Sequence, residues 1–80
     1  MIIKVLGPGC ANCQNLERVT REALDELGVD ATIEKVVDYA EIMGYGVMST
    51  PGLVINEQVV LSGRVPTRAQ VAQLIAVALE

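Results

Sequence analysis

The first half of the chain alternates between short apolar runs and one long amphipathic segment. Residues 1–7 are rich in isoleucine and valine, which is typical of a central strand covered on both faces. From Ala11 to Leu27 apolar side chains recur at helical spacing, and Gly28 favours an end to that helix. The segment 31–37 has the β-branched composition of a strand, and its charged Glu34-Lys35 pair favours a position near a sheet edge.

Two capping patterns predict helices in the second half. Asp38, with Glu41 three residues later, has the form of a capping box and predicts a short helix through Met43. Thr67, with a glutamine three residues later, forms a second candidate box. The apolar stripe that follows over residues 71–79 predicts a last helix.

Between these two helices the pattern predicts a β-hairpin. The apolar runs Gly52–Ile55 and Val59–Ser62 flank the polar segment 56–58, as two antiparallel strands joined by a tight turn would. The order is therefore strand, helix, strand, helix, strand, strand, helix. It predicts an α/β fold with a four-stranded mixed sheet and helices on both faces. With 80 residues and 51% hydrophobic content, the chain is expected to form one domain over residues 1–80.

Composition excludes several classes of function. The net charge is −4 and the only aromatic residues are Tyr39 and Tyr45, so neither a phosphate-binding surface nor a base-stacking platform is indicated, and nucleic acid is not an expected partner. The absence of histidine excludes a Cys-His nucleophile and a histidine-ligated metal. No segment approaches the roughly 20 consecutive apolar residues of a membrane helix. No export signal follows Met1, so we expect a cytoplasmic monomer that does not contact a membrane.

The two cysteines, Cys10 and Cys13, lie between the first predicted strand and the long helix. Thiols three positions apart on the first turn of a helix share one face and are close enough to bridge. The positive end of the helix favours ionisation of Cys10, whose pKa we expect to lie below the value of about 8.5 for free cysteine. In a reducing cytoplasm such a pair is more often catalytic, redox-sensing or metal-binding than structural. The pair is therefore a candidate redox disulfide.

The order of elements and three motifs resemble the thioredoxin fold in its shortest, glutaredoxin-sized form. More narrowly, the chain is similar over essentially its whole length to the small redox-active disulfide proteins, a thioredoxin-like family. The motifs that carry the resemblance are Gly7-Pro8-Gly9-Cys10-Ala11-Asn12-Cys13, Ser49-Thr50-Pro51-Gly52 and the Ser62-Gly63-Arg64 segment leading to Pro66.

The resemblance implies a thiol-disulfide oxidoreductase or redox carrier that reduces protein disulfides. In that family the first cysteine attacks a substrate disulfide and the second resolves the mixed disulfide, and by position these roles fall on Cys10 and Cys13. The resemblance also implies a cis-proline at Pro51, opposite the cysteines, with Thr50 offering backbone hydrogen bonds to an extended substrate. The expected partners are disulfide-containing proteins and a separate reductase. No cofactor and no resident metal are implied.

Two further questions stay open for the same region. Copper chaperones also carry Cys-x-x-Cys after a first strand, so Cys10 and Cys13 could instead hold Cu(I) or another soft metal. Those chaperones usually place a methionine where this chain has Pro8, and they end on a strand rather than on a helix. Lys4, the one charge of the first strand, either lies beneath the sulfurs and favours thiolate or simply reaches solvent.

Overall fold

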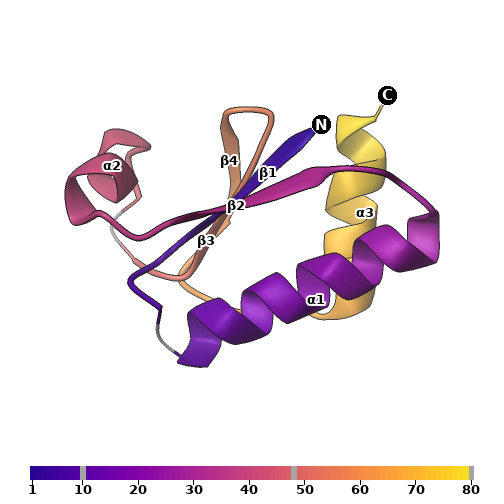
Figure 1. Cartoon of the computed structure of the whole chain (residues 1–80), viewed down its shortest axis with the longest axis horizontal. Helices are drawn as coiled ribbons and strands as arrows, with labels where there is room; N and C mark the ends of the chain where they lie inside the picture. Colours follow the sequence, from indigo (N-terminus) through magenta and orange to yellow (C-terminus); the bar gives the residue numbers. More distant parts are fainter. Residues whose placement is uncertain (10, 48, 80) are drawn as a thin grey trace.

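The computed structural model describes residues 1–9, 11–47 and 49–79. Its elements follow the predicted order and form one mixed sheet with three helices around it (Figure 1). In chain order they are β1 (Ile2–Leu6), α1 (Ala11–Leu27), β2 (Thr32–Val36), α2 (Tyr39–Gly44), β3 (Gly52–Ile55), β4 (Gln58–Ser62) and α3 (Arg68–Ala78). The predicted α/β class and mixed four-stranded sheet are confirmed.

The sheet has the strand order β2-β1-β3-β4. β1 pairs with β2 in parallel and with β3 antiparallel, and β3 pairs antiparallel with β4. The strand that leads to the cysteines is therefore central, as its apolar composition predicted. β2 lies at an edge, which accommodates the charged side chains of Glu34 and Lys35.

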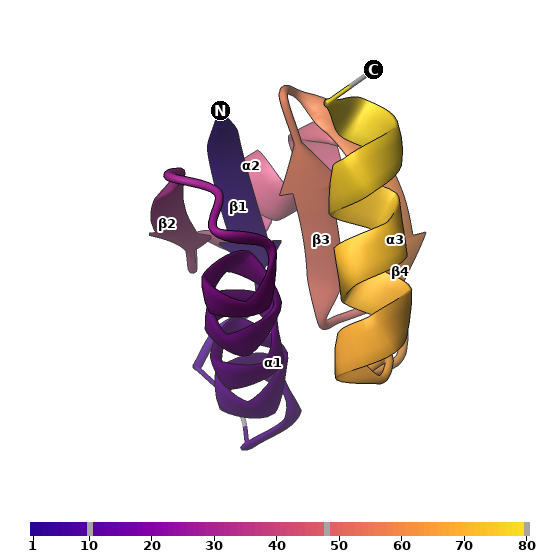
Figure 2. The same cartoon turned by 90° about the vertical axis from the view of Figure 1, so that its right-hand side faces the viewer.

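Helices cover both faces of the sheet, and each face has its own apolar cluster. α1 and α3 lie side by side in front of the sheet in Figure 2, whereas α2 lies behind it. Successive side chains of β1 point to opposite faces of the sheet, so the strand contributes to both clusters. Ile3 and Val5 pack with the α1 and α3 side chains, and Leu6 packs with Ile42 of α2. β1 is thus held on both faces, and its carboxyl end has a fixed position from which α1 begins.

The β3–β4 hairpin has a shorter turn than the sequence pattern predicted. Gln58 already pairs with Ile55, so the loop consists of Asn56 and Glu57 alone, and the prediction of a three-residue turn over 56–58 was wrong. Both loop residues have positive φ, 50° and 68°, which is the geometry of a two-residue turn that matches the twist of its strands. Asparagine adopts this conformation readily. Glutamate occupies the position where such turns usually have glycine, so the sequence did not indicate a two-residue turn.

One of the two predicted capping boxes is complete. In α3 the Thr67 hydroxyl accepts a hydrogen bond from the Gln70 N–H at 3.2 Å, and the Gln70 side chain accepts one from the Thr67 N–H at 3.0 Å. At α2 the Asp38 carboxylate accepts a hydrogen bond of 2.9 Å from the N–H of Ala40 rather than from that of Glu41. Among the described residues no hydrogen bond of Glu41 completes a box there, so this prediction was half right. The Asp38 carboxylate thus caps one of the free N–H groups at the start of α2.

Candidate functional site

The N-terminal end of α1 carries the thiol chemistry of the chain. Cys13 lies in the first turn of α1, with its side chain facing the core and 5% of its surface exposed. It is disulfide-bonded. Cys10, predicted as the nucleophile, lies outside the described residues.

Gly7, which follows β1, allows Cys13 to approach the end of the strand. The Gly7 N–H donates a hydrogen bond to the Val36 carbonyl at 2.9 Å, which fixes it beside β2. A Cβ atom on Gly7 would overlap the Cys13 Sγ and would lie 3.8 Å from the Cβ of Thr50. Only a residue without a side chain therefore fits between the buried sulfur and the loop that carries Thr50.

The loop before β3 brings Thr50 and Pro51 to the same end of the sheet. The Thr50-Pro51 peptide bond is cis, and the Pro51 side chain is fully buried. The Pro51 carbonyl accepts a hydrogen bond of 2.8 Å from the N–H of Gly63 in the next loop. Gly63 has a φ of 81°, and a side chain there would press on Ser49. Residues of the three motifs thus lie at one end of the sheet: Gly7 is next to Thr50, and Pro51 is hydrogen-bonded to Gly63.

A small cavity opens beside the buried sulfur. Its volume is about 70 Å³. The residues that line it come from the end of β1, the first two turns of α1 and the end of β2: Val5, Gly7, Gly9, Cys13, Gln14, Glu17, Lys35 and Val37. Glu17 and Lys35 form an ion pair in its wall, with Lys35 Nζ 3.1 Å from Glu17 Oε1. Sequence reasoning missed Glu17, although its position four residues after Cys13 placed both on one helix face.

Lys4 takes no part in this site. It pairs across β1 and β3 with Val54, on the face that α2 covers, opposite to α1. There its ammonium group lies 2.8 Å from Glu57 Oε1 and 2.8 Å from the Tyr45 hydroxyl oxygen. The hydrogen bond with Glu57 raises the pKa of Lys4 most, followed by the one with Tyr45. Lys4 therefore does not lie beneath the Cys13 sulfur, and its ammonium group is held by Glu57 and Tyr45 rather than by solvent alone.

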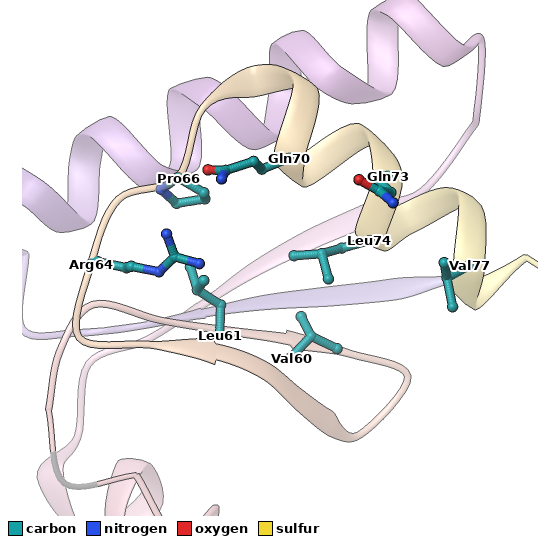
Figure 3. Close-up of a pocket in the computed structure, with 8 residues that line it drawn as sticks. All are labelled: Val60, Leu61, Arg64, Pro66, Gln70, Gln73, Leu74 and Val77. Carbon is teal, nitrogen blue, oxygen red and sulfur yellow. The ribbon is translucent and has the colours of Figure 1, made fainter.

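A larger groove lies between β4 and α3. It has a volume of about 340 Å³, and its walls are Val60, Leu61, Arg64, Pro66, Gln70, Gln73, Leu74 and Val77. Figure 3 shows Val60 and Leu61 both pointing toward α3, because a register shift in the β3–β4 pairing leaves one extra residue in β4. Among the described residues, no thiol and no carboxylate line this groove. The described Cys13 lines the smaller cavity and not this groove.

Within residues 1–9, 11–47 and 49–79 no group of three or more His, Cys, Asp or Glu side chains is arranged to hold a metal ion. In the same part of the chain no helix is long and apolar enough to cross a membrane.

The central β1, the cysteine at the start of α1 and the cis-proline loop beside it define a thioredoxin-fold protein with a thiol site at the strand-to-helix junction. Comparison with known proteins agrees. The sequence model described as "Thioredoxin domain" matches residues 1–76. A thioredoxin of Methanothermobacter thermautotrophicus is 38% identical over 76 residues, which are 95% of this chain and 99% of that protein. A thioredoxin of Methanocaldococcus jannaschii is 32% identical over 80 residues, which are 100% of this chain and 92% of that protein.

The chain therefore belongs to the thioredoxin domain family, and its class of activity is that of a disulfide oxidoreductase. The predicted family resemblance is confirmed. These relatives do not support the alternative of a Cu(I) or other soft-metal carrier. Thiol-disulfide redox chemistry is the class of function that the family supports.

Proposed function

We propose that the chain reduces disulfide bonds of other proteins by cycling Cys10 and Cys13 between dithiol and disulfide, with Cys10 as the attacking thiol and Cys13 as the resolving thiol. The observation that carries the proposal is the state and place of Cys13. It is disulfide-bonded and buried at the start of α1, and Cys10 is the other of the two cysteines in the sequence.

The proposed cycle balances without an external oxidant. The Cys10 thiolate attacks one sulfur of the substrate disulfide, and the other substrate sulfur leaves as a thiol. Cys13 then attacks Cys10 Sγ, which releases the second substrate thiol and forms the Cys10–Cys13 disulfide. Two electrons pass from the chain to the substrate, and a separate dithiol reductase returns them. The division of roles is supported by burial, since an attacking thiol needs access and a resolving thiol does not.

Substrate contact is proposed at Thr50 and Pro51. Both lie in the loop that approaches Gly7, and Thr50 is partly exposed beside the buried Cys13. Backbone groups of this loop would pair with an extended substrate segment next to its disulfide. We propose a protein reductase rather than glutathione as the electron donor, because a chain of net charge −4 offers no basic clamp for that tripeptide. The cycle suits a reducing compartment such as the cytoplasm.

Insulin reduction tests this proposal. With dithiothreitol as the electron donor, the wild-type chain should accelerate precipitation of the insulin B chain, and Cys10→Ser and Cys13→Ser should both lose that acceleration. Asn15→Ala, an exposed substitution in the same helix, is the matched control and should retain it. Full activity in either serine variant would refute the two-thiol cycle.

A further inference from the structure

β4 is an edge strand whose outer edge carries no charged side chain. The strand order places β2 and β4 at the two edges of the sheet, and among the described residues no strand pairs with the outer side of β4. Edge strands of natural proteins usually carry charges or proline, which discourage pairing with another chain. β2 follows this rule with Glu34 and Lys35, whereas β4 has the uncharged sequence Gln-Val-Val-Leu-Ser. The outward-facing N–H and C=O groups of β4 are therefore accessible to another extended segment.

The groove between β4 and α3 lies beside this edge, and most of its wall is apolar. Val60 and Leu61 of β4 and Leu74 of α3 are only half-buried. Val77, at the end of the groove, is 61% exposed. The volume of about 340 Å³ falls in the range of roughly 300–1,000 Å³ that is usual for ligand sites. A pocket beside an open strand edge is the arrangement by which sheets bind extended peptides.

Arg64 stands at one end of the groove without a carboxylate partner. Figure 3 shows its guanidinium group between Pro66 and Leu61, with Val77 at the opposite end. The other five basic side chains each have a carboxylate oxygen no more than 3.7 Å away: Lys4, Arg18, Arg21, Lys35 and Arg68. Arg64 has none among residues 1–9, 11–47 and 49–79. Because a guanidinium group can bind a carboxylate through two parallel hydrogen bonds, an acidic group on the ligand would match this end of the groove.

The charge of this part of the chain also favours an acidic ligand. Residues 52–79 contain two arginines and one acidic residue, Glu57, which gives them a net charge of +1, whereas the whole chain carries −4. Glu57 is bound by Lys4 on the α2 face of the sheet, and the groove lies on the α3 face. The sequences of β3, β4 and α3 contain no other carboxylate that could compete for Arg64.

A second copy of the chain fits this surface less well than a different protein does. Two copies joined edge to edge along β4 would bring together identical uncharged strands, which offer no carboxylate to Arg64. Each copy also carries a net charge of −4, and like charges oppose association. An acidic segment of another protein satisfies both the open edge and the arginine.

We propose that β4 and α3 form a docking surface for an extended acidic segment of a partner protein. The segment adds to the sheet as a fifth strand along β4 through main-chain hydrogen bonds, places an apolar side chain between Leu61 and Leu74, and places a carboxylate on Arg64. Among the described residues, none lines both this groove and the cavity of Cys13. The inference therefore goes beyond the proposed thiol cycle and can be tested without it.

Titration of the isotopically labelled, oxidised chain with short peptides tests the docking surface by nuclear magnetic resonance. The probes are acetyl-Asp-Ser-Ile-Thr-Val-Thr-amide and the same residues in reverse order, which cover both strand directions. At least one should shift the N–H resonances of β4 and α3 in a saturable way at millimolar concentration and leave those of Gly7 and Gly9 in place. Asparagine instead of the aspartate should weaken binding about tenfold, because a charged hydrogen bond is lost. Proline in the middle of the peptide should abolish binding, since proline cannot pair along a strand.

Variants of the chain identify the contacts. Arg64→Gln should weaken binding of the aspartate peptide about tenfold and leave binding of the asparagine peptide unchanged, which a double-mutant cycle measures. Arg18→Gln, which removes an exposed arginine of α1 outside the groove, is the matched control and should bind as the wild type does. Val60→Lys places a charge on the edge strand and should abolish binding.

Four outcomes would overturn the proposal. The first is the absence of saturable shifts in β4 and α3 with either peptide, and the second is equal affinity for the aspartate and asparagine peptides. The third is a wild-type dimer in sedimentation equilibrium that Val60→Lys separates, because a second copy would then occupy the groove. The fourth is a groove that responds to sodium octanoate but not to the peptides, which would identify a small amphiphile as the ligand.

Discussion

Lys4 Nζ lies 2.8 Å from Glu57 Oε1, and this ion pair joins the middle of the central strand to the turn of the β3–β4 hairpin. The Tyr45 hydroxyl bridges the two charges, 2.8 Å from Lys4 Nζ and 3.3 Å from Glu57 Oε2. Glu57 occupies a left-handed backbone conformation, with a φ of 68°, that side chains rarely adopt. The contact explains why a glutamate is tolerated where a glycine would fit the turn more easily.

The stability of the fold should depend on pH through this pair. The hydrogen bond with Lys4 is the main cause that holds the pKa of Glu57 below its ordinary value of 4.5. A lowered folded-state pKa means that the contribution of Glu57 is present above pH 4.5 and is lost as the pH falls through the folded value. The difference in unfolding free energy between the wild type and Glu57→Gln should therefore be constant near neutral pH and shrink in acid.

Urea unfolding at a series of pH values measures that difference. In alkali the argument concerns Lys4, whose pKa in the folded chain is raised above the ordinary lysine value of 10.5. The contribution of the ion pair to the unfolding free energy is therefore fully present below pH 10.5 and is lost as the pH rises through the higher folded-state pKa of Lys4. Because Glu57 is largely exposed, added salt should weaken the effect. A difference that grows as the pH falls below 4.5 would contradict this assignment.

The two roles of Glu57 can be separated by comparing substitutions. Glu57→Gln removes the charge and keeps a side chain in the left-handed conformation, whereas Glu57→Gly removes the charge and relieves the backbone. We expect Glu57→Gly to unfold at a higher urea concentration than Glu57→Gln. If Glu57→Gly proves the less stable of the two, the turn is not strained by its side chain.

Gly7 should be the glycine least tolerant of a methyl group near the thiol site. In Gly7→Ala the new Cβ would overlap the Cys13 Sγ, so we expect a loss of about 1–3 kcal/mol, typical of overpacking. Gly44→Ala is the matched control, because a Cβ there has no neighbouring atom within 4 Å and its φ is not in the left-handed region. Chemical unfolding of the oxidised chain compares them, and equal stability of the two variants would show that the thiol end of the sheet adapts freely.

The capping box of α3 should make a measurable contribution. Thr67→Ala removes the hydroxyl that accepts from the Gln70 N–H, and loss of such a cap costs about 1 kcal/mol. The unfolding midpoint in urea should fall with an unchanged slope. Asp38→Ala removes the cap of α2 and offers a comparison on the other face of the sheet. A Thr67→Ala midpoint equal to that of the wild type would show that the box is dispensable.

Local patterns in the sequence were enough to predict the order of the elements. Helical spacing placed α1 at Ala11–Leu27, the bounds that the structure has, because its apolar stripe is regular and Gly28 ends it. The Thr67 box located α3 for the same reason, since both of its partners are neighbours in sequence. The hairpin loop was misjudged because Asn-Glu lacks the glycine that usually signals a two-residue turn.

The surroundings of the thiol site could not be predicted in the same way. The Glu17–Lys35 pair joins α1 to β2, and the hydrogen bond from Gly63 to Pro51 joins two loops. Such contacts depend on how the elements pack rather than on any spacing in the sequence. The position of Lys4 on the α2 face follows from the register of β1, which a strand with poor alternation does not reveal.

Trapping of the mixed disulfide tests the central claim most directly. Reduced Cys13→Ser should form a stable covalent adduct with a disulfide-containing protein such as insulin, and mass spectrometry of the digested adduct should place the linkage on Cys10. The wild-type chain should release its substrate and show a peptide pair joined between Cys10 and Cys13. Absence of any adduct on Cys10, together with a wild-type chain that oxidises without a Cys10–Cys13 linkage, would contradict the account.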